Sequence, residues 1–367
     1  MTRRLAIGTV VIGASGFIAL SYELLWYRLA SFAASSTLAA FPLLLGSYLV
    51  GIALGSLGAE RIVAAGRDTL RATSFALFAG AVIGALVGVL FGELLVIGVG
   101  YYASLLVFVF GALSLGFLFP LLGQWAVPAD ENVGAGVSYL YASNIVGSVL
   151  GTIVTGFVLL DHLTLAEMTA LLSTLGALLF LVVSLAGDAP RRGRSIALTA
   201  VLIAASWLVV PTMYDGIWGK LFYWEAAPSR PAFAEVYEGR AGVVVVTEDG
   251  RALSGGVYEG TFAIDLVHDK NGLLRAFAGP MIHPDPKRVL VIGVATGSWA
   301  TVLANAPGVE ELVLVEIEHL WPRVIGDRDP QRGLFDDDRI TWVFDDARRW
   351  LSANPDEKFD LIVMNST

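Results

Sequence analysis

The sequence predicts an α-helical transmembrane bundle of about seven helices, followed by a small β element and a partial α/β domain. Two observations indicate this fold class. The 367 residues are 56% hydrophobic and only 16% charged, with a mean hydropathy of +0.69, which is too apolar for an ordinary soluble domain. The charge is also divided, because residues 1–213 hold nine Arg, no Lys and nine acidic residues, whereas 214–367 hold 15 basic and 24 acidic residues. A membrane domain is therefore expected to precede an acidic, water-soluble one.

The composition also excludes some partners and chemistries. The formal charge of −9 lies wholly in residues 214–367, and an acidic domain does not suit nucleic acid, which needs clustered Lys and Arg. The chain has no Cys, which excludes disulfides and thiolate chemistry. We therefore expect the lipid bilayer as a partner, no nucleic acid and no metal site.

Seven apolar stretches in the first 213 residues have the length of bilayer-spanning helices, which need about 20 mostly apolar residues each. Their predicted bounds are 5–30, 38–59, 73–98, 101–123, 135–160, 165–187 and 196–212. A cleaved signal peptide has one short apolar region, so the first stretch is expected to be a retained helix.

Small residues recur at the four-residue spacing that lets helix backbones approach closely. They are Gly51 and Gly55, the series from Gly80 to Gly92, and Gly147 and Gly151. We interpret them as static packing positions of the bundle, with a gating or transport interface as the alternative.

Glu23 and Arg28 are ionisable residues inside the first predicted helix, where a charge costs free energy unless it has a partner or a function. They are five positions apart, about 140° around a helix, so they do not face each other. Glu23 is expected to need a donor from another helix. We favour a structural polar contact for Glu23 over a substrate or proton site, and an interfacial position for Arg28 beside Trp26 and Tyr27.

Three clusters of Arg predict the orientation of the bundle. They are Arg3 and Arg4, then Arg61, Arg67 and Arg71, then Arg191, Arg192 and Arg194. If each stretch spans once, all three clusters lie on one side, which the positive-inside rule assigns to the cytoplasm. Seven crossings then carry the C-terminal domain to the other face. We expect an integral protein of a bacterial inner membrane, with a cytoplasmic N-terminus, and we favour an extracytoplasmic C-terminal domain. The alternative is that the number of crossings differs by one, which keeps this domain in the cytoplasm.

The soluble half divides into two parts. Residues 214–280 are predicted to hold an interfacial linker, over 216–231, and then a small antiparallel sheet built from short β-rich runs within 233–266. A short helix is expected over 272–278. Residues 281–367 are predicted to alternate parallel strands and helices, with strands over 288–293, 311–316, 340–344 and 359–364.

The first two of these strands have the features of a nucleotide-binding βαβ unit. The strand from Arg288 ends at Gly293, and Gly297 precedes a helix-like stretch over 298–305. The second strand ends in Glu316, 19 residues after Gly297. Glycines let the backbone approach a nucleotide, and an acid at this position accepts hydrogen bonds from ribose hydroxyls. The alternative is a structural α/β turn with a solvated Glu316.

Residues 281–367 resemble the front half of the spermidine synthase family, the aminopropyltransferases with a Rossmann-like, class I methyltransferase fold. The matching segments are "HPDPKRVLVIGVATG", "PGVEELVLVEIE", "DDDRITWVFDDARRWL" and "KFDLIVMNS". The segments "SGFIALSYELLWYR" and "GVSYLYASNIVGSVLG" resemble helices of the subgroup in which this domain follows a membrane bundle. The resemblance implies an S-adenosylmethionine or decarboxylated S-adenosylmethionine site, with Gly293 and Gly297 at the ligand, Glu316 at the ribose, and Asp346 and Ala347 at the adenine.

The sequence departs from the family pattern at positions that matter for catalysis. The family's first loop is usually Gly-Gly-Gly-Asp-Gly, and Thr296 occupies the place of its Asp. The expected catalytic Asp after the fourth strand is Asn365, and an amide does not act as a general base at neutral pH. The family's Tyr-His-Glu element is not evident, and Thr367 follows only four strands of a sheet that normally has seven. A second copy or another subunit is expected to complete the sheet.

Three functions follow from these features. We favour a non-catalytic, degenerate nucleotide-fold domain that acts as a structural or docking subunit of a membrane assembly, with no certain cofactor. The alternative is a membrane-bound aminopropyltransferase, or another S-adenosyl-dependent transferase, acting on a polyamine-like substrate. A transporter ranks third, because nothing resembles a complete transporter repeat.

Overall fold

The computed structural model describes residues 2–129, 132–187, 192–224, 233–267, 269, 271–326 and 328–365. They form two compact units, Met1–Arg230 and Pro231–Thr367. Arg191 of the third Arg cluster and residues 225–231 of the expected linker lie outside the described residues.

The first unit is a helical bundle. Its helices are α1 (Arg3–Ala33), α2 (Ala40–Ala64), α3 (Thr69–Val96), α4 (Tyr101–Ser104), α5 (Leu106–Gly116), α6 (Leu118–Ala126), α7 (Val133–Val154), a π-helical turn (Thr155–Leu159), α8 (Leu160–His162), α9 (Leu165–Ala186), α10 (Arg192–Leu208), α11 (Val210–Tyr214) and α12 (Ile217–Phe222). Several of these join end to end, so the described part of the chain contains seven helices that are long and apolar enough to cross a membrane. The expectation of about seven long apolar helices is confirmed.

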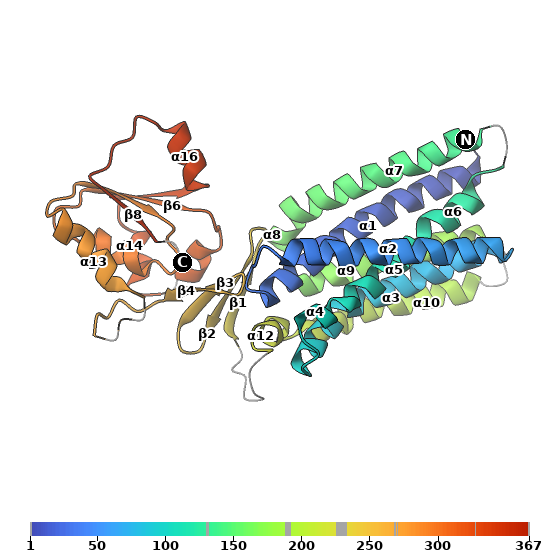
Figure 1. The fold of residues 1–367 in the computed structure, drawn as a ribbon, viewed down its shortest axis with the longest axis horizontal. Helices are drawn as coiled ribbons and strands as arrows, with labels where there is room; N and C mark the ends of the chain where they lie inside the picture. The colour runs from blue at the N-terminus through green and yellow to red at the C-terminus, as the bar shows by residue number, and fades with distance from the viewer. Residues whose placement is uncertain are drawn as a thin grey trace. The chain divides into compact units, whose positions relative to one another are not determined.

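Glycines bring α1 and α7 into close contact along much of their length (Figure 1). A Cβ atom on Gly147 would collide with the carbonyl oxygen of Gly13, and one on Gly151 would lie 2.5 Å from that of Phe17. Ser143 donates a hydrogen bond across the same interface to the carbonyl of Thr9, at 2.7 Å. The backbones therefore pack together as the sequence predicts for small residues at this spacing.

The α3 glycines receive bulky side chains from other helices. A Cβ on Gly84 would lie 2.7 Å from the Tyr22 ring, and one on Gly88 would lie 2.5 Å from the Tyr214 hydroxyl. The helix α12 packs on the same end of the bundle, where Trp218 is buried and its ring lies 4.9 Å from that of Phe32. Residues 217–222, which the sequence analysis assigned to an interfacial linker, thus pack on the helices because Ile217, Trp218 and Leu221 share one apolar face.

Contacts between helices also show which helix termini lie at the same end of the bundle. The start of α1 meets the end of α6, where Arg4 lies over the Trp125 ring, and the start of α3 meets the end of α9, where Ser184 donates to Ser74 at 3.2 Å. At the opposite end, Trp224 donates to the carbonyl of Ala33 at 3.3 Å. The described chain therefore leaves the bundle at the end opposite to its N-terminus.

The second unit begins with an antiparallel sheet of four strands in sequential order. They are β1 (Phe233–Glu238), β2 (Val243–Thr247), β3 (Arg251–Ser254) and β4 (Val257–Thr261). The short β3 was not predicted, because its sequence has only four residues between the turns at Gly250 and Gly255, both of which have positive φ. Both glycines adopt a backbone conformation that other residues disfavour.

The rest of the unit is a parallel sheet with helices on both faces. Its strands are β5 (Arg288–Ile292), β6 (Glu311–Glu316), β7 (Ile340–Phe344) and β8 (Leu361–Met364), in the order β7-β6-β5-β8. Its helical segments are α13 (Leu273–Ile282), α14 (Ser298–Ala304), α15 (Trp321–Ile325), the 3-10 turn Gln331–Leu334 and α16 (Ala347–Ala353). β5 pairs in parallel with both β6 and β8, which confirms the expected parallel α/β arrangement.

The core of this unit lies on both faces of the parallel sheet. Val289 and Leu312 pack with α14 and α15 on one face, whereas Leu290 and Val313 pack near Trp350 and Phe359 on the other. The central strands are apolar on both faces, as the sequence predicted for buried parallel strands.

Candidate functional site

The sheet brings the expected site residues of the second unit to one edge. The amide of Gly293 donates to the carbonyl of Val315 at 2.9 Å, and the amide of Asn365 donates to that of Ile292 at 2.9 Å. Asp345, which follows β7, donates its amide to the carbonyl of Glu316 at 3.1 Å. The carboxyl ends of parallel strands are where α/β folds place their ligands.

The loop after β5 has the backbone form of a nucleotide-binding turn but carries side chains inside it. Gly293 and Gly297 have φ of 79° and 77°, and a Cβ on Gly293 would lie 2.6 Å from the carbonyl oxygen of Asn365. Between them, Val294 and Ala295 are buried, and Ala295 has a φ of 49°. An alanine pays a steric cost in this left-handed conformation, whereas glycine does not.

Glu316 points its carboxylate at this loop. One carboxylate oxygen accepts the amides of Val294 at 2.7 Å and Ala295 at 3.2 Å, and the other accepts the amide of Glu318 at 2.8 Å. The residue is 5% exposed. Three backbone donors therefore compensate its buried charge, and both oxygens on which ribose binding was predicted to depend already have partners.

Asp346 and Ala347 begin α16 beyond β7. Asp346 caps the helix by accepting the amide of Arg348 at 2.8 Å, and its carboxylate forms an ion pair with the Arg348 side chain, also at 2.8 Å. The hydrogen bond from that side chain, together with the one from the backbone amide, holds the pKa of Asp346 well below its usual value. Ala347 is half-buried and packs against the sheet. In this structure the carboxylate of Asp346 therefore serves as the N-cap of α16.

Asn365 lies directly after β8, beside Gly293, where the sequence placed it. Its backbone extends the parallel pairing, and its side chain makes no hydrogen bond to any residue that the structure describes. Thr296 is buried with its hydroxyl 3.2 Å from that of Ser298, and it packs against Gly260 of β4. Neither residue supplies a carboxylate to the edge of the sheet.

Sequence reasoning missed a polar network that ties β4 to α14. Asn271 accepts the amide of Thr261 and donates to its carbonyl, both at 2.5 Å, and Trp299 donates to the Asn271 carbonyl at 2.9 Å. Gln331 is fully buried and donates to the carbonyl of Phe262 at 2.6 Å. The Asn-Gly pair at 271 and 272 is a turn signal, but no local pattern marks Gln331.

Glu23 and Arg28 lie in the first unit, on α1. Both are half-buried, and Glu23 makes no hydrogen bond or ion pair with a described residue. The donor expected from another helix is therefore not observed among the described residues. Within the described ranges, no group of three or more His, Asp or Glu residues could hold a metal ion.

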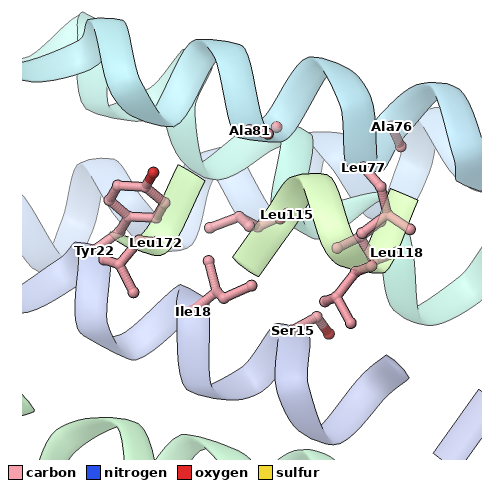
Figure 2. Close-up of a pocket in the computed structure, with 12 residues that line it drawn as sticks. Ser15, Ile18, Tyr22, Ala76, Leu77, Ala81, Leu115, Leu118 and Leu172 are labelled. Carbon is pink, nitrogen blue, oxygen red and sulfur yellow. The ribbon is translucent and has the colours of Figure 1, made fainter. Parts of the chain in front are cut away.

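A small cavity lies inside the bundle among α1, α3, α5, α6 and α9 (Figure 2). Its volume is about 20 Å³, and Ser15 and Tyr22 contribute the polar groups of a lining that is otherwise Ala, Gly, Ile and Leu. The Tyr22 hydroxyl is buried and has no hydrogen-bond partner in the described part of the chain. A space of this size holds about one water molecule, so it is too small for an organic substrate.

Comparisons with known proteins find relatives that are similar to part of this chain. No protein-family model matches the chain. The polyamine aminopropyltransferase of Thermococcus onnurineus is 35% identical over 88 residues, which cover 24% of this chain and 31% of that protein. That of Agathobacter rectalis is 36% identical over 87 residues, covering 23% and 30%, and that of Pseudomonas syringae pv. tomato is 36% identical over 89 residues, covering 24% and 31%.

Two solved structures of spermidine synthases are also similar to part of this chain. Spermidine synthase from Thermotoga maritima has a TM-score of 0.31 and 19% identity, over 40% of this chain and 53% of that one. A spermidine synthase in complex with the transition-state analogue AdoDATO has a TM-score of 0.32 and 18% identity, over 40% and 51%. The aligned segment spans about a third of the length of the curated relatives. The sequence matches and the parallel sheet show that the C-terminal region is spermidine synthase-like, with a methyltransferase-like fold.

Proposed function

We propose that this chain is an integral membrane protein whose spermidine synthase-like domain does not itself transfer aminopropyl groups and serves as a structural or docking subunit of a membrane assembly. Seven helices of bilayer length and apolar composition support the membrane location. The partners would be the lipid bilayer and other membrane subunits, or a second copy that pairs with β8.

The observation that best supports a non-catalytic domain is the burial and hydrogen bonding of the Glu316 carboxylate. Its carboxylate accepts three backbone amides and is nearly inaccessible to solvent. Val294 and Ala295 of the loop after β5 are buried and pack into the hydrophobic core with α14 and α15. With Asn365 in place of a carboxylate, the end of β8 offers no side-chain general base for an attacking amine.

A second candidate is a membrane-bound aminopropyltransferase, or another S-adenosyl-dependent transferase, acting on a polyamine-like substrate. The matches at 35% and 36% identity to polyamine aminopropyltransferases favour it. It would require the nearly buried carboxylate of Glu316 to become accessible to a ribose.

Calorimetry of the full chain in detergent separates these candidates. The ligands are S-adenosylmethionine, its decarboxylated form and methylthioadenosine, and the subunit function predicts no saturable heat with any of them. It also predicts no product from putrescine and decarboxylated S-adenosylmethionine. Saturable binding together with steady turnover by the unaltered chain would establish the transferase instead. Turnover only after Asn365→Asp would indicate descent from an active enzyme and leave the subunit function in place.

A further inference from the structure

The helix α13 presents apolar side chains on both of its faces. Leu273 and Ala276 are buried in a small core with Trp299 and Val302. On the outer face Leu274 and Phe277 are exposed, and Met281 is 78% exposed. These three positions follow the three- and four-residue spacing of a single helix face. A helix on the surface of a soluble unit normally turns polar residues outward, so this face is suited to a second apolar environment.

A groove runs beside this face. It has a volume of about 600 Å³ and is lined by Phe277, Pro280 and Met281 of α13, by Val302 of α14, and by Ile264 and Pro307 among others. Thr301 and Asn305 are the only lining residues with polar side chains. The outer face of α13 and this groove together form a continuous apolar surface, here named the α13 surface, because Phe277 and Met281 belong to both.

The charge around the α13 surface differs from that of the rest of its unit. Residues 231–367 contain 13 basic and 22 acidic residues, but 264–287 contain three of each, together with two His. The whole excess of nine acidic residues thus lies outside this segment. The sequence of α13 itself has no acid and one base, Arg275, which is exposed. Anionic lipid headgroups would therefore repel this segment less than the rest of the acidic unit.

We propose that the α13 surface binds the surface of a lipid bilayer that contains anionic lipid, with Phe277 and Met281 at the boundary between headgroups and acyl chains and Arg275 among the headgroups. Interfacial helices combine these features, namely an apolar face, a basic side chain and no acid. The bilayer is the apolar phase available to a chain with seven helices of membrane length. This inference rests on the proposed membrane location.

Spin labels can test this proposal in the intact chain, because the absence of Cys allows single-cysteine variants without other changes. Met281→Cys reports on the α13 surface. Leu150→Cys, on the exposed face of α7, reports on the bundle, and Leu351→Cys, on α16 and away from the edge strand β8, is the control, since Leu351 is also apolar and exposed, at 37%. Each labelled protein is placed in nanodiscs of phosphatidylcholine with phosphatidylglycerol, and collision rates with oxygen and with a water-soluble nickel chelate are measured.

We expect the labels at 281 and 150 to collide preferentially with oxygen, and the label at 351 to collide preferentially with the nickel chelate. The ratio of the oxygen to the nickel collision rate should differ several-fold between the two groups. We also expect Arg275→Glu to move the label at 281 toward the nickel chelate. A water-exposed label at 281 with a lipid-exposed label at 150 would overturn this inference and leave the membrane location intact. A water-exposed label at 150 would overturn the membrane location itself. Spin coupling between labels at 281 of two copies would assign the α13 surface to self-association instead.

Discussion

At the scale of single residues, Glu316 distinguishes a structural carboxylate from a ligand-binding one. Its three amide partners come from the loop after β5 and from the residue two positions on. A carboxylate in this setting fixes the loop conformation because it satisfies backbone donors that would otherwise be buried without acceptors. The three amides take up three of the roughly four acceptor sites of this carboxylate, which leaves about one for a ribose hydroxyl.

Replacing this carboxylate should therefore destabilise the unit. In Glu316→Gln the side-chain amide group faces backbone N–H donors, so we expect a loss of about 1–3 kcal/mol in the free energy of unfolding. The measurement is chemical denaturation followed by tryptophan fluorescence. Glu310→Gln is the control, because Glu310 forms an exposed ion pair with Lys287 and such pairs contribute at most about 1 kcal/mol. An unchanged stability of Glu316→Gln would favour a ligand-binding role.

Asp360 should make the stability of the second unit depend on pH. Its carboxylate accepts the amides of Arg288 and Lys287, each at 2.9 Å, and these bonds lower its pKa. A lowered folded-state pKa stabilises the fold above the unfolded pKa of about 3.9, and this contribution is lost as the pH falls through the folded pKa. As the pH is lowered below about 5, we expect the denaturant concentration at the unfolding midpoint to fall less steeply in Asp360→Ala than in the unaltered chain.

The control for this experiment is Asp356→Ala, since Asp356 is exposed and makes no hydrogen bond with a described residue. Its pH profile should match that of the unaltered chain. Parallel profiles for Asp360→Ala and the unaltered protein would show that other carboxylates set the acid sensitivity.

At the scale of secondary-structure elements, the glycines of α7 allow its close contact with α1. A methyl group on Gly147 would meet the carbonyl of Gly13, whereas a Cβ on Gly134 of the same helix has nothing within 4 Å. We expect Gly147→Ala to lower bundle stability by about 1–3 kcal/mol, as overpacking typically does. Gly134→Ala should be neutral or slightly stabilising. Equal thermal stability of the two detergent-solubilised variants would mean that α7 shifts to accommodate the methyl group.

At the scale of the whole molecule, the bundle contacts bear on orientation. The N-terminal ends of α1 and α3 lie at the same end of the helical bundle. Trp224, which follows α12, contacts the opposite end of the bundle. If the helices span a bilayer, the Arg clusters and the exit of the chain lie on opposite sides. With the positive-inside rule, this arrangement agrees with the expectation from the Arg clusters that the C-terminal unit is extracytoplasmic.

Labelling of single cysteines in spheroplasts tests this orientation. Glu248→Cys lies at the exposed turn after β2, and Arg67→Cys lies between α2 and α3 at the Arg-rich end. An impermeant maleimide should label position 248 in intact spheroplasts and position 67 only after lysis. The reverse pattern would place the C-terminal unit in the cytoplasm, where S-adenosyl ligands are made, and would revive the transferase.

The sequence by itself determined the elements whose signals are local. Seven apolar stretches predicted the long helices, and runs such as Val289 to Ile292 predicted buried parallel strands, since apolar length and periodicity are carried by neighbouring residues. The resemblance placed Gly293, Glu316 and Asn365 at one edge of the sheet, and the strand order brings them there.

Only the tertiary structure decided what those residues contact. Glu316 bonds to amides 21 and 22 positions earlier in the chain, and Gln331 reaches Phe262, 69 positions away. The inward packing of Trp218 and the outward face of α13 also depend on which neighbours fold against them. An apolar side chain has the same local pattern whether it meets a protein core or remains exposed, so burial is decided by long-range packing and not by the local sequence.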